Sequence, residues 1–128
     1  MGSYGKAAGR AVQYLHSNQY TPREAWNRAT IELFGEGTSR QQKGCPRGAF
    51  LGLCEEGLIK GVEQGKYSHS LKNKHYAVMA VELLKMNMDL INDKKKLWNL
   101  VTNESGISQN HQLDVVISLW KEGYINTW

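Results

Sequence analysis

The residues best suited to chemistry lie together in the run Lys43-Gly44-Cys45-Pro46-Arg47, which we call the cysteine run. It combines two cations, a thiol and a glycine. We expect a helix to begin near Cys45-Pro46, because proline is favoured in the first turn of a helix. The unpaired amides and positive dipole of a helix start attract anions, and Gly44 allows a ligand close to the backbone. With charge added by Lys43 and Arg47, the run predicts a site for a phosphate or carboxylate. The plainer interpretation is an ordinary solvated helix start, since short motifs often occur without function.

The thiol of Cys45 has a second interpretation, as a reactive group. At a helix start the dipole and the neighbouring cations favour a thiolate, which can act as a nucleophile or redox sensor. A catalytic thiol also needs a base, and His69 or His75 can supply it only if the fold brings one of them close. Cys54 lies on the same short predicted helix, which argues against a disulfide and favours a small core residue. We therefore expect a non-enzymatic protein, with a cysteine-dependent enzyme as an alternative.

Basic and aromatic side chains also gather in the connector 60–74, a mixture suited to nucleic acid. A solvated connector is the plainer interpretation, because no recognised nucleic-acid motif accompanies these residues. The loop 35–44 is far longer than the turn of a helix-turn-helix, so that DNA-binding fold is not expected. We combine the end of the connector with the cysteine run in one predicted anion site, which consists of Lys43, Gly44, Cys45, Arg47, Lys72, Asn73 and Lys74.

Metal and cofactor chemistry have no support in the sequence. The four histidines, His16, His69, His75 and His111, lack the paired spacing of zinc ligands. No cluster of Asp and Glu suits a divalent metal, which also argues against a metal-dependent nuclease. We therefore expect neither a metal nor a cofactor.

Length and composition predict one globular domain, 1–128, that folds without metals or disulfides. Hydrophobic residues make up 41% and charged residues 22%, which excludes the polar composition of a disordered chain. The net charge of +4 favours anionic partners without requiring one. No apolar run reaches the roughly 18 residues of a membrane span, and the start lacks the pattern of a secretion signal. We expect a cytoplasmic protein without a membrane partner.

Apolar spacing and helix caps predict an all-α fold. The firmest helix start is Thr21-Pro22-Arg23-Glu24, where Thr21 can cap the helix and Glu24 can bond back to it, as in a capping box. The glycine-rich segment 61–66 is the one place where a short β-hairpin can form. The six expected helices cover about 4–18, 22–34, 45–56, 73–88, 94–101 and 110–122.

The two halves of the chain resemble each other. The run 53–59, LCEEGLI, parallels the run 119–125, LWKEGYI, and each ends a helix at glycine before two apolar residues. A tryptophan also occupies the second helix of both halves. We therefore predict a compact six-helix domain of two pseudo-repeated three-helix units, about 3–61 and 72–126. Chance similarity between amphipathic helices is the alternative.

Nearly the whole chain resembles an uncharacterised family of short bacterial proteins of unknown function. The residues that carry the resemblance are the run 43–55, KGCPRGAFLGLCE, with Asn73-Lys74, Tyr76-Ala77, Asp114-Val115-Val116 and Leu119-Trp120. The resemblance implies a stand-alone bacterial domain and brings with it no activity, cofactor or catalytic residue.

Our leading hypothesis is a small bacterial or phage protein that binds an anionic ligand, either a nucleic acid or a phosphorylated small molecule. The first alternative is a protein-protein adaptor or inhibitor, such as a defence or anti-defence component, and the second is the cysteine-dependent enzyme. A large exposed apolar patch would favour the adaptor. A histidine within hydrogen-bond reach of Cys45 would favour the enzyme.

Overall fold

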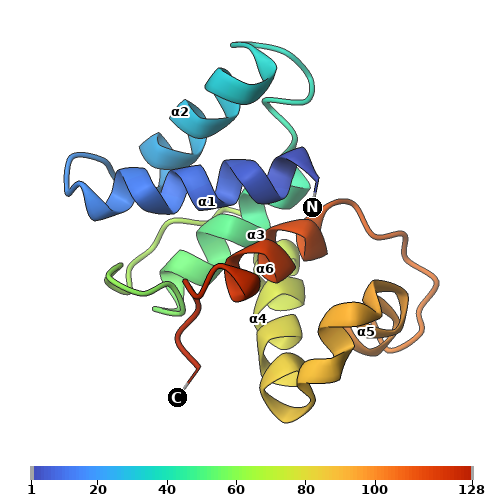
Figure 1. Cartoon of the computed structure of the whole chain (residues 1–128). Coiled ribbons are helices and arrows are strands. Elements are labelled where there is room, and N and C mark those ends of the chain that lie inside the picture. The colour runs from blue at the N-terminus through green and yellow to red at the C-terminus, as the bar shows by residue number, and fades with distance from the viewer. Residues whose placement is uncertain (1, 128) are drawn as a thin grey trace.

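The structure is a computed structural model that describes residues 2–127 (Figure 1). The described residues form helices and a single isolated β-bridge, so the all-α prediction is confirmed. None of these helices is both long and apolar enough to cross a membrane. In chain order the elements are α1 (Ser3–His16), α2 (Pro22–Phe34), α3 (Gly44–Glu55), α4 (Leu71–Met86), the 3-10 helix η1 (Met88–Asn92), α5 (Lys94–Val101) and α6 (Gln112–Lys121).

Side-chain caps set where α2 and α4 begin. The hydroxyl of Thr21 accepts a hydrogen bond from the amide of Glu24, at 3.2 Å, and the Glu24 carboxylate accepts one from the amide of Thr21, at 2.9 Å. This reciprocal pair confirms the predicted capping box. Ser70 caps α4 by accepting from the amide of Asn73, and α4 therefore begins at Leu71, slightly before the predicted start.

Helices α3 and α6 lie at the centre of the molecule, with α1 and α2 packed on one side and α4 and α5 on the other (Figure 1). Trp26 of α2 stacks on Phe50 of α3, with 5.1 Å between ring centroids. Trp98 of α5 meets Tyr76 of α4 edge to face at 5.0 Å. All four rings are buried. These aromatic pairs attach the outer helices to the helices beside them, where large rings bury the most apolar surface.

Equivalent positions of the two halves end their helices in the same way. Gly57 and Gly123 adopt the left-handed backbone, with φ of 72° and 80°, after α3 and α6. The amides of Leu58 and Tyr124 then bond back to carbonyls five residues earlier, both at 3.0 Å, as in a Schellman motif. Just beyond these residues, Ile59 and Ile125 pair in an antiparallel bridge. The ends of α3 and α6 thus join at matching positions, while the pseudo-repeat of two three-helix units stays a prediction.

The prediction of a hairpin in the segment 61–66 is wrong. Its backbone forms no strand and is held instead on the end of α3. The amide of Gly65 donates to the carbonyl of Glu55 at 3.3 Å, and the side chain of Gln64 donates to the carbonyl of Glu56 at 3.2 Å. The last carbonyls of a helix lack partners within the helix, so they bind this connector in place of a second strand.

Glycines on one face of α3 allow an unusually close approach to α4. A Cβ added at Gly52 would lie 2.6 Å from the Cα of Lys74, and one added at Gly48 would lie 2.9 Å from the Cβ of Asn73. Gly44, Gly48 and Gly52 recur every fourth residue, a spacing that places them on one side of a helix. The contacts of Gly48 with the first turn of α4 bring the N-termini of the two helices together.

We predict that Gly52→Ala lowers the free energy of unfolding by roughly 1–3 kcal/mol, because the new methyl group must displace the backbone of α4. Urea denaturation of both proteins measures this loss. The matched control is Gly44→Ala, whose Cβ would meet only the tip of the Arg47 side chain, at 3.6 Å. Equal losses in the two variants would show that the α3–α4 contact is looser than described.

Candidate functional site

A cleft of about 480 Å³ opens where the N-termini of α3 and α4 meet. We call it the α3–α4 cleft. Five residues of the predicted anion site line it, although they come from separate parts of the chain. They are Lys43, Gly44, Cys45, Arg47 and Asn73.

The fold adds lining residues that the sequence did not assign to an anion site. Arg23 comes from the first turn of α2, His69 and Ser70 from the connector before α4, and Asn110 from the segment before α6. Arg23 lies within the capping-box sequence, so the sequence pattern indicates only that it belongs to the start of a helix. Its place beside the cysteine run arises only when α2 packs against α3.

Positive charge dominates the α3–α4 cleft. Its described lining contains Arg23, Lys43 and Arg47 and contains no Asp or Glu. The first amides of any helix lack acceptors within the helix, and α3 has no side-chain cap to accept from them. The positive end of the α4 dipole also faces this side. The arrangement therefore suits an anion that accepts hydrogen bonds.

The three cations are free of carboxylate partners among residues 2–127. Arg23 donates through Nη2 to the carbonyl of Tyr67 at 3.1 Å, a bond that holds the guanidinium and leaves its other N–H groups for a ligand. Arg47 makes one long contact, 3.5 Å, with the carbonyl of Gln42. The side chain of Lys43 forms neither a hydrogen bond nor an ion pair with the described residues. The positive charge of the cleft thus remains uncompensated by the described protein groups.

Asn73 holds the wall of the cleft together. Its Nδ2 donates to the hydroxyl of Ser70 at 2.9 Å, and its Oδ1 accepts from Nε2 of Gln112 at 3.0 Å. The same Gln112 accepts from the amide of Asn110 at 2.6 Å. These bonds link the start of α4 to the start of α6. Asn73 is therefore a positioning residue for the cleft.

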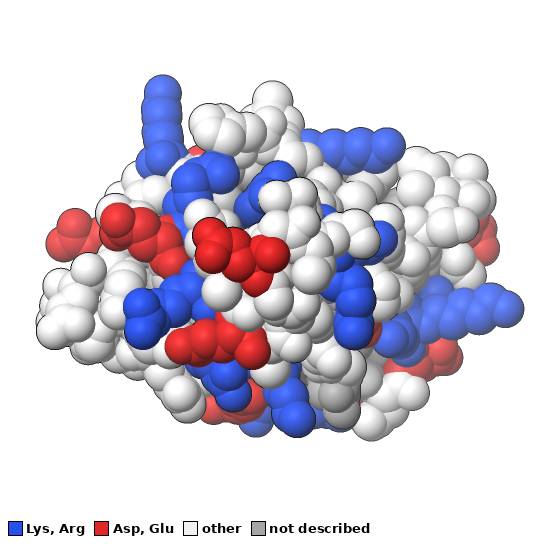
Figure 2. Space-filling view, turned by 90° about the horizontal axis from the view of Figure 1, so that it is seen from above, with Lys and Arg blue, Asp and Glu red and all other residues white. Residues whose placement is uncertain are grey.

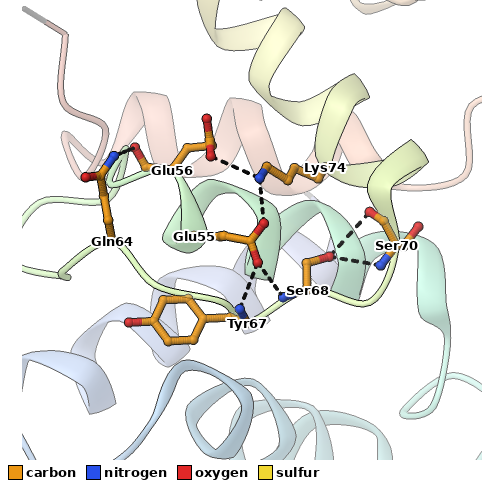
Figure 3. Close-up of polar contacts among 7 residues, drawn as sticks. All are labelled: Glu55, Glu56, Gln64, Tyr67, Ser68, Ser70 and Lys74. Carbon is orange, nitrogen blue, oxygen red and sulfur yellow. Dashed lines mark hydrogen bonds and ion pairs between the residues drawn. The ribbon is translucent and has the colours of Figure 1, made fainter.

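The remaining two residues of the predicted anion site, Lys72 and Lys74, do not line the cleft. The Lys74 ammonium pairs with the carboxylates of Glu55, at 2.5 Å, and Glu56, at 2.9 Å, as Figure 3 shows. The Lys72 ammonium lies 6.0 Å from the ring centroid of Tyr76. The charge of Lys74 is thus compensated within the protein. A role for either lysine in anion binding stays a prediction.

Glu55 organises the connector before α4 (Figure 3). Besides Lys74, its carboxylate accepts from the amides of Tyr67, at 2.8 Å, and Ser68, at 3.1 Å. The hydrogen bond from Lys74 and these two amides lower the pKa of Glu55 to about 2. The hydrogen bond to Glu55 and, to a smaller extent, the one to Glu56 raise the pKa of Lys74. The network fixes the connector that carries His69 and Ser70 to the cleft.

The thiol of Cys45 is half-buried in the cleft and contacts an amide. Nδ2 of Asn110 lies 3.7 Å from its Sγ, and the hydrogen bonds of the described residues include none between this thiol and a histidine. His69 lines the same cleft, whereas the ring of His75 lies beside Tyr76. Cys54 is fully buried, and burial raises the pKa of its thiol, so it serves as a core residue.

Charges of both signs are mixed on one face of the molecule. On the face shown in Figure 2, Lys and Arg side chains are interspersed with Asp and Glu. Ion pairs such as Arg28 with Glu32, 3.7 Å apart, accompany this mixture on α2. Within residues 2–127, no group of three or more His, Cys, Asp or Glu side chains could hold a metal ion. The described lining of the α3–α4 cleft, in contrast, contains no Asp or Glu.

Comparison with known proteins identifies a family without an assigned activity. The family described as "Family of unknown function (DUF6979)" matches residues 1–126, so the chain belongs to it. No curated protein and no solved structure matches the chain.

We predict that Glu55→Gln destabilises the protein by roughly 1–3 kcal/mol at neutral pH, because charged hydrogen bonds to Lys74 and two amides are lost. Folding lowers the pKa of Glu55 from 4.5 to about 2. Its carboxylate therefore stabilises the fold above the higher value, and this contribution is lost as the pH falls through the lower one.

Urea denaturation at a series of pH values measures the free energy of unfolding of the native and variant proteins. The difference between them should shrink as the pH falls from about 4.5 to about 2. Glu63→Gln, on the same connector and exposed, is the matched control and should change stability little at any pH. A difference for Glu55→Gln that stays constant with pH would contradict the role given to the carboxylate.

Proposed function

We propose that this member of the family of unknown function binds a phosphate-bearing small molecule in the α3–α4 cleft and does not transform it. One observation carries the proposal: three cations, Arg23, Lys43 and Arg47, line a single cleft whose described lining contains no carboxylate. Confined positive charge without acidic neighbours favours a ligand with concentrated negative charge.

The chemistry of the cleft favours a phosphate over a single carboxylate. The guanidinium groups of Arg23 and Arg47 present planar sets of N–H donors, which match the oxygen atoms of a phosphate. The uncapped start of α3 adds backbone donors and the positive end of its dipole. Gly44 has no side chain to shield these amides from a ligand. A tetrahedral anion can use all of these donors together.

The size and surroundings of the site favour a small ligand over a polynucleotide. Its volume of about 480 Å³ lies in the range of small-molecule sites. A nucleic acid would need a longer basic surface to follow successive phosphates. Lys74, at the end of the basic connector, has its charge compensated by Glu55 and Glu56. The face seen in Figure 2 mixes both signs.

An adaptor function is the second candidate, and one apolar region favours it. Met86 and Met88, at the end of α4 and in η1, are 83% and 62% exposed. Met88 also lines a groove of about 370 Å³ together with Trp120 and Ile125. Flexible methionine side chains are common where proteins bind partners. This region lies at the C-terminal end of α4, whereas the α3–α4 cleft lies at its N-terminal end, so variants can separate the two functions.

The proposal predicts that inorganic phosphate shifts the amide resonances of Gly44, Cys45 and Arg47 in NMR titrations. Arg47→Ala should weaken phosphate binding by at least about tenfold, because a hydrogen bond between charged groups is lost. Lys95→Ala, an exposed cation on α5, is the matched control and should leave affinity unchanged. Substitution of Met86 and Met88 by Glu should likewise leave it unchanged. Shifts confined to other helices would contradict the site.

Nucleic acid is tested separately with labelled single-stranded RNA and duplex DNA at two salt concentrations. We expect neither to bind more tightly than small phosphates. Micromolar binding that falls with salt and disappears in Arg47→Ala would instead assign a polynucleotide to the cleft.

A further inference from the structure

A second cleft, of about 400 Å³, adjoins the α3–α4 cleft, and Lys43 lines both. It opens between the N-termini of α1 and α6, and we call it the α1–α6 cleft. Its wall includes the hydroxyl-bearing Ser3 and Ser39 together with His111 and Asp114. The two clefts thus meet at Lys43, and a ligand that occupied both would pass beside its side chain.

The imidazole of His111 is oriented by a carboxylate. Its Nδ1 lies 2.8 Å from Oδ2 of Asp114, whose other oxygen accepts from the Lys94 ammonium at 2.7 Å. Burial acts to raise the pKa of Asp114, but the hydrogen bonds from Lys94 and His111 outweigh it and lower that pKa. An ionised Asp114 can only accept, so Nδ1 of His111 donates to it. In the neutral ring, Nε2 is then an acceptor.

Two further contacts hold this ring in place. It packs against the ring of Tyr4, with 4.7 Å between centroids. The His111 backbone has φ of 70°, a left-handed conformation that disfavours a residue with a side chain. Such conformations persist where the surroundings determine them and cluster at binding sites. Nε2 has no hydrogen-bond partner in the part of the chain that the structure describes.

We infer that the ligand is a phosphorylated polyol or sugar, with its phosphate in the α3–α4 cleft and its hydroxyl groups in the α1–α6 cleft. This inference rests on the proposed function. Nε2 of His111 accepts a hydrogen bond from a ligand hydroxyl, and Ser3 and Ser39 offer groups that both donate and accept. Lys43 lies at the junction of the two parts of the ligand.

The α1–α6 cleft suits hydroxyl groups better than a second phosphate. The Asp114 carboxylate belongs to its lining and would repel another anion. Besides Lys43, the lining of the α1–α6 cleft contains Arg40. The Arg40 guanidinium lies over the ring of Phe34, 4.6 Å from its centroid. Nε2 of His111, which has no hydrogen-bond partner among the described residues, can bond to a ligand hydroxyl. The two clefts thus differ in the part of the ligand that each binds.

Calorimetric titration with ribose 5-phosphate, methyl phosphate and inorganic phosphate tests the inference. We expect ribose 5-phosphate to bind about tenfold more tightly than methyl phosphate, since hydrogen bonds from its hydroxyls are added. Adenosine monophosphate distinguishes a nucleotide from a free sugar phosphate as the source of this chemistry. Equal affinity for ribose 5-phosphate and methyl phosphate would overturn the inference and leave the proposed function intact. Failure of all these phosphates to bind would overturn both.

The matched variant is His111→Asn, because asparagine tolerates the left-handed backbone while removing the Nε2 acceptor. It should abolish the advantage of ribose 5-phosphate and leave methyl phosphate binding unchanged. Imidazole nitrogen resonances of the native protein provide a measurement that needs no variant. Ribose 5-phosphate should shift Nε2 of His111 and leave His16, on the far end of α1, unchanged. The absence of any His111 shift would also overturn the inference.

Discussion

The contact between glycines of α3 and the backbone of α4 is the constraint on which the candidate site depends. Gly48 and Gly52 leave no room for a Cβ against Asn73 and Lys74, so the two helices meet at a shorter separation than larger side chains permit. Because Gly48 faces the first turn of α4, the contact places two helix starts beside each other. The cleft with its cations forms at this junction.

The distribution of charge follows from the same packing. The approach of α4 brings Lys74 to the end of α3, where Glu55 and Glu56 compensate its charge. Glu55 also holds the connector that leads to Ser70, the cap of α4. Carboxylates are thus used at the C-terminal end of α3, while its N-terminal end keeps cations without acidic partners among the described residues. This separation favours an anion at one end of the helix.

Local sequence predicted the helices well, and it predicted part of the lining of the candidate cleft. The apolar spacing and the Thr21 capping box act within a few residues, so their effects can be read from the chain. The cysteine run was found because it combines charge with a predicted helix start. Arg23 and the pairing of His111 with Asp114 escaped prediction, since the first depends on packing between α2 and α3 and the second lies on an unremarkable helix start.

The spacing of Gly44, Gly48 and Gly52 could have predicted the close helix contact, because small residues four apart form one smooth face.

Anion binding in the α3–α4 cleft can be tested with a crystal structure grown in the presence of tungstate, because the anomalous scattering of tungsten locates this phosphate-like anion. We expect a tungstate between Arg23, Arg47 and the first amides of α3. A crystal that holds tungstate only elsewhere on the protein, with the α3–α4 cleft open to solvent and free of it, would show that the cleft is not an anion site.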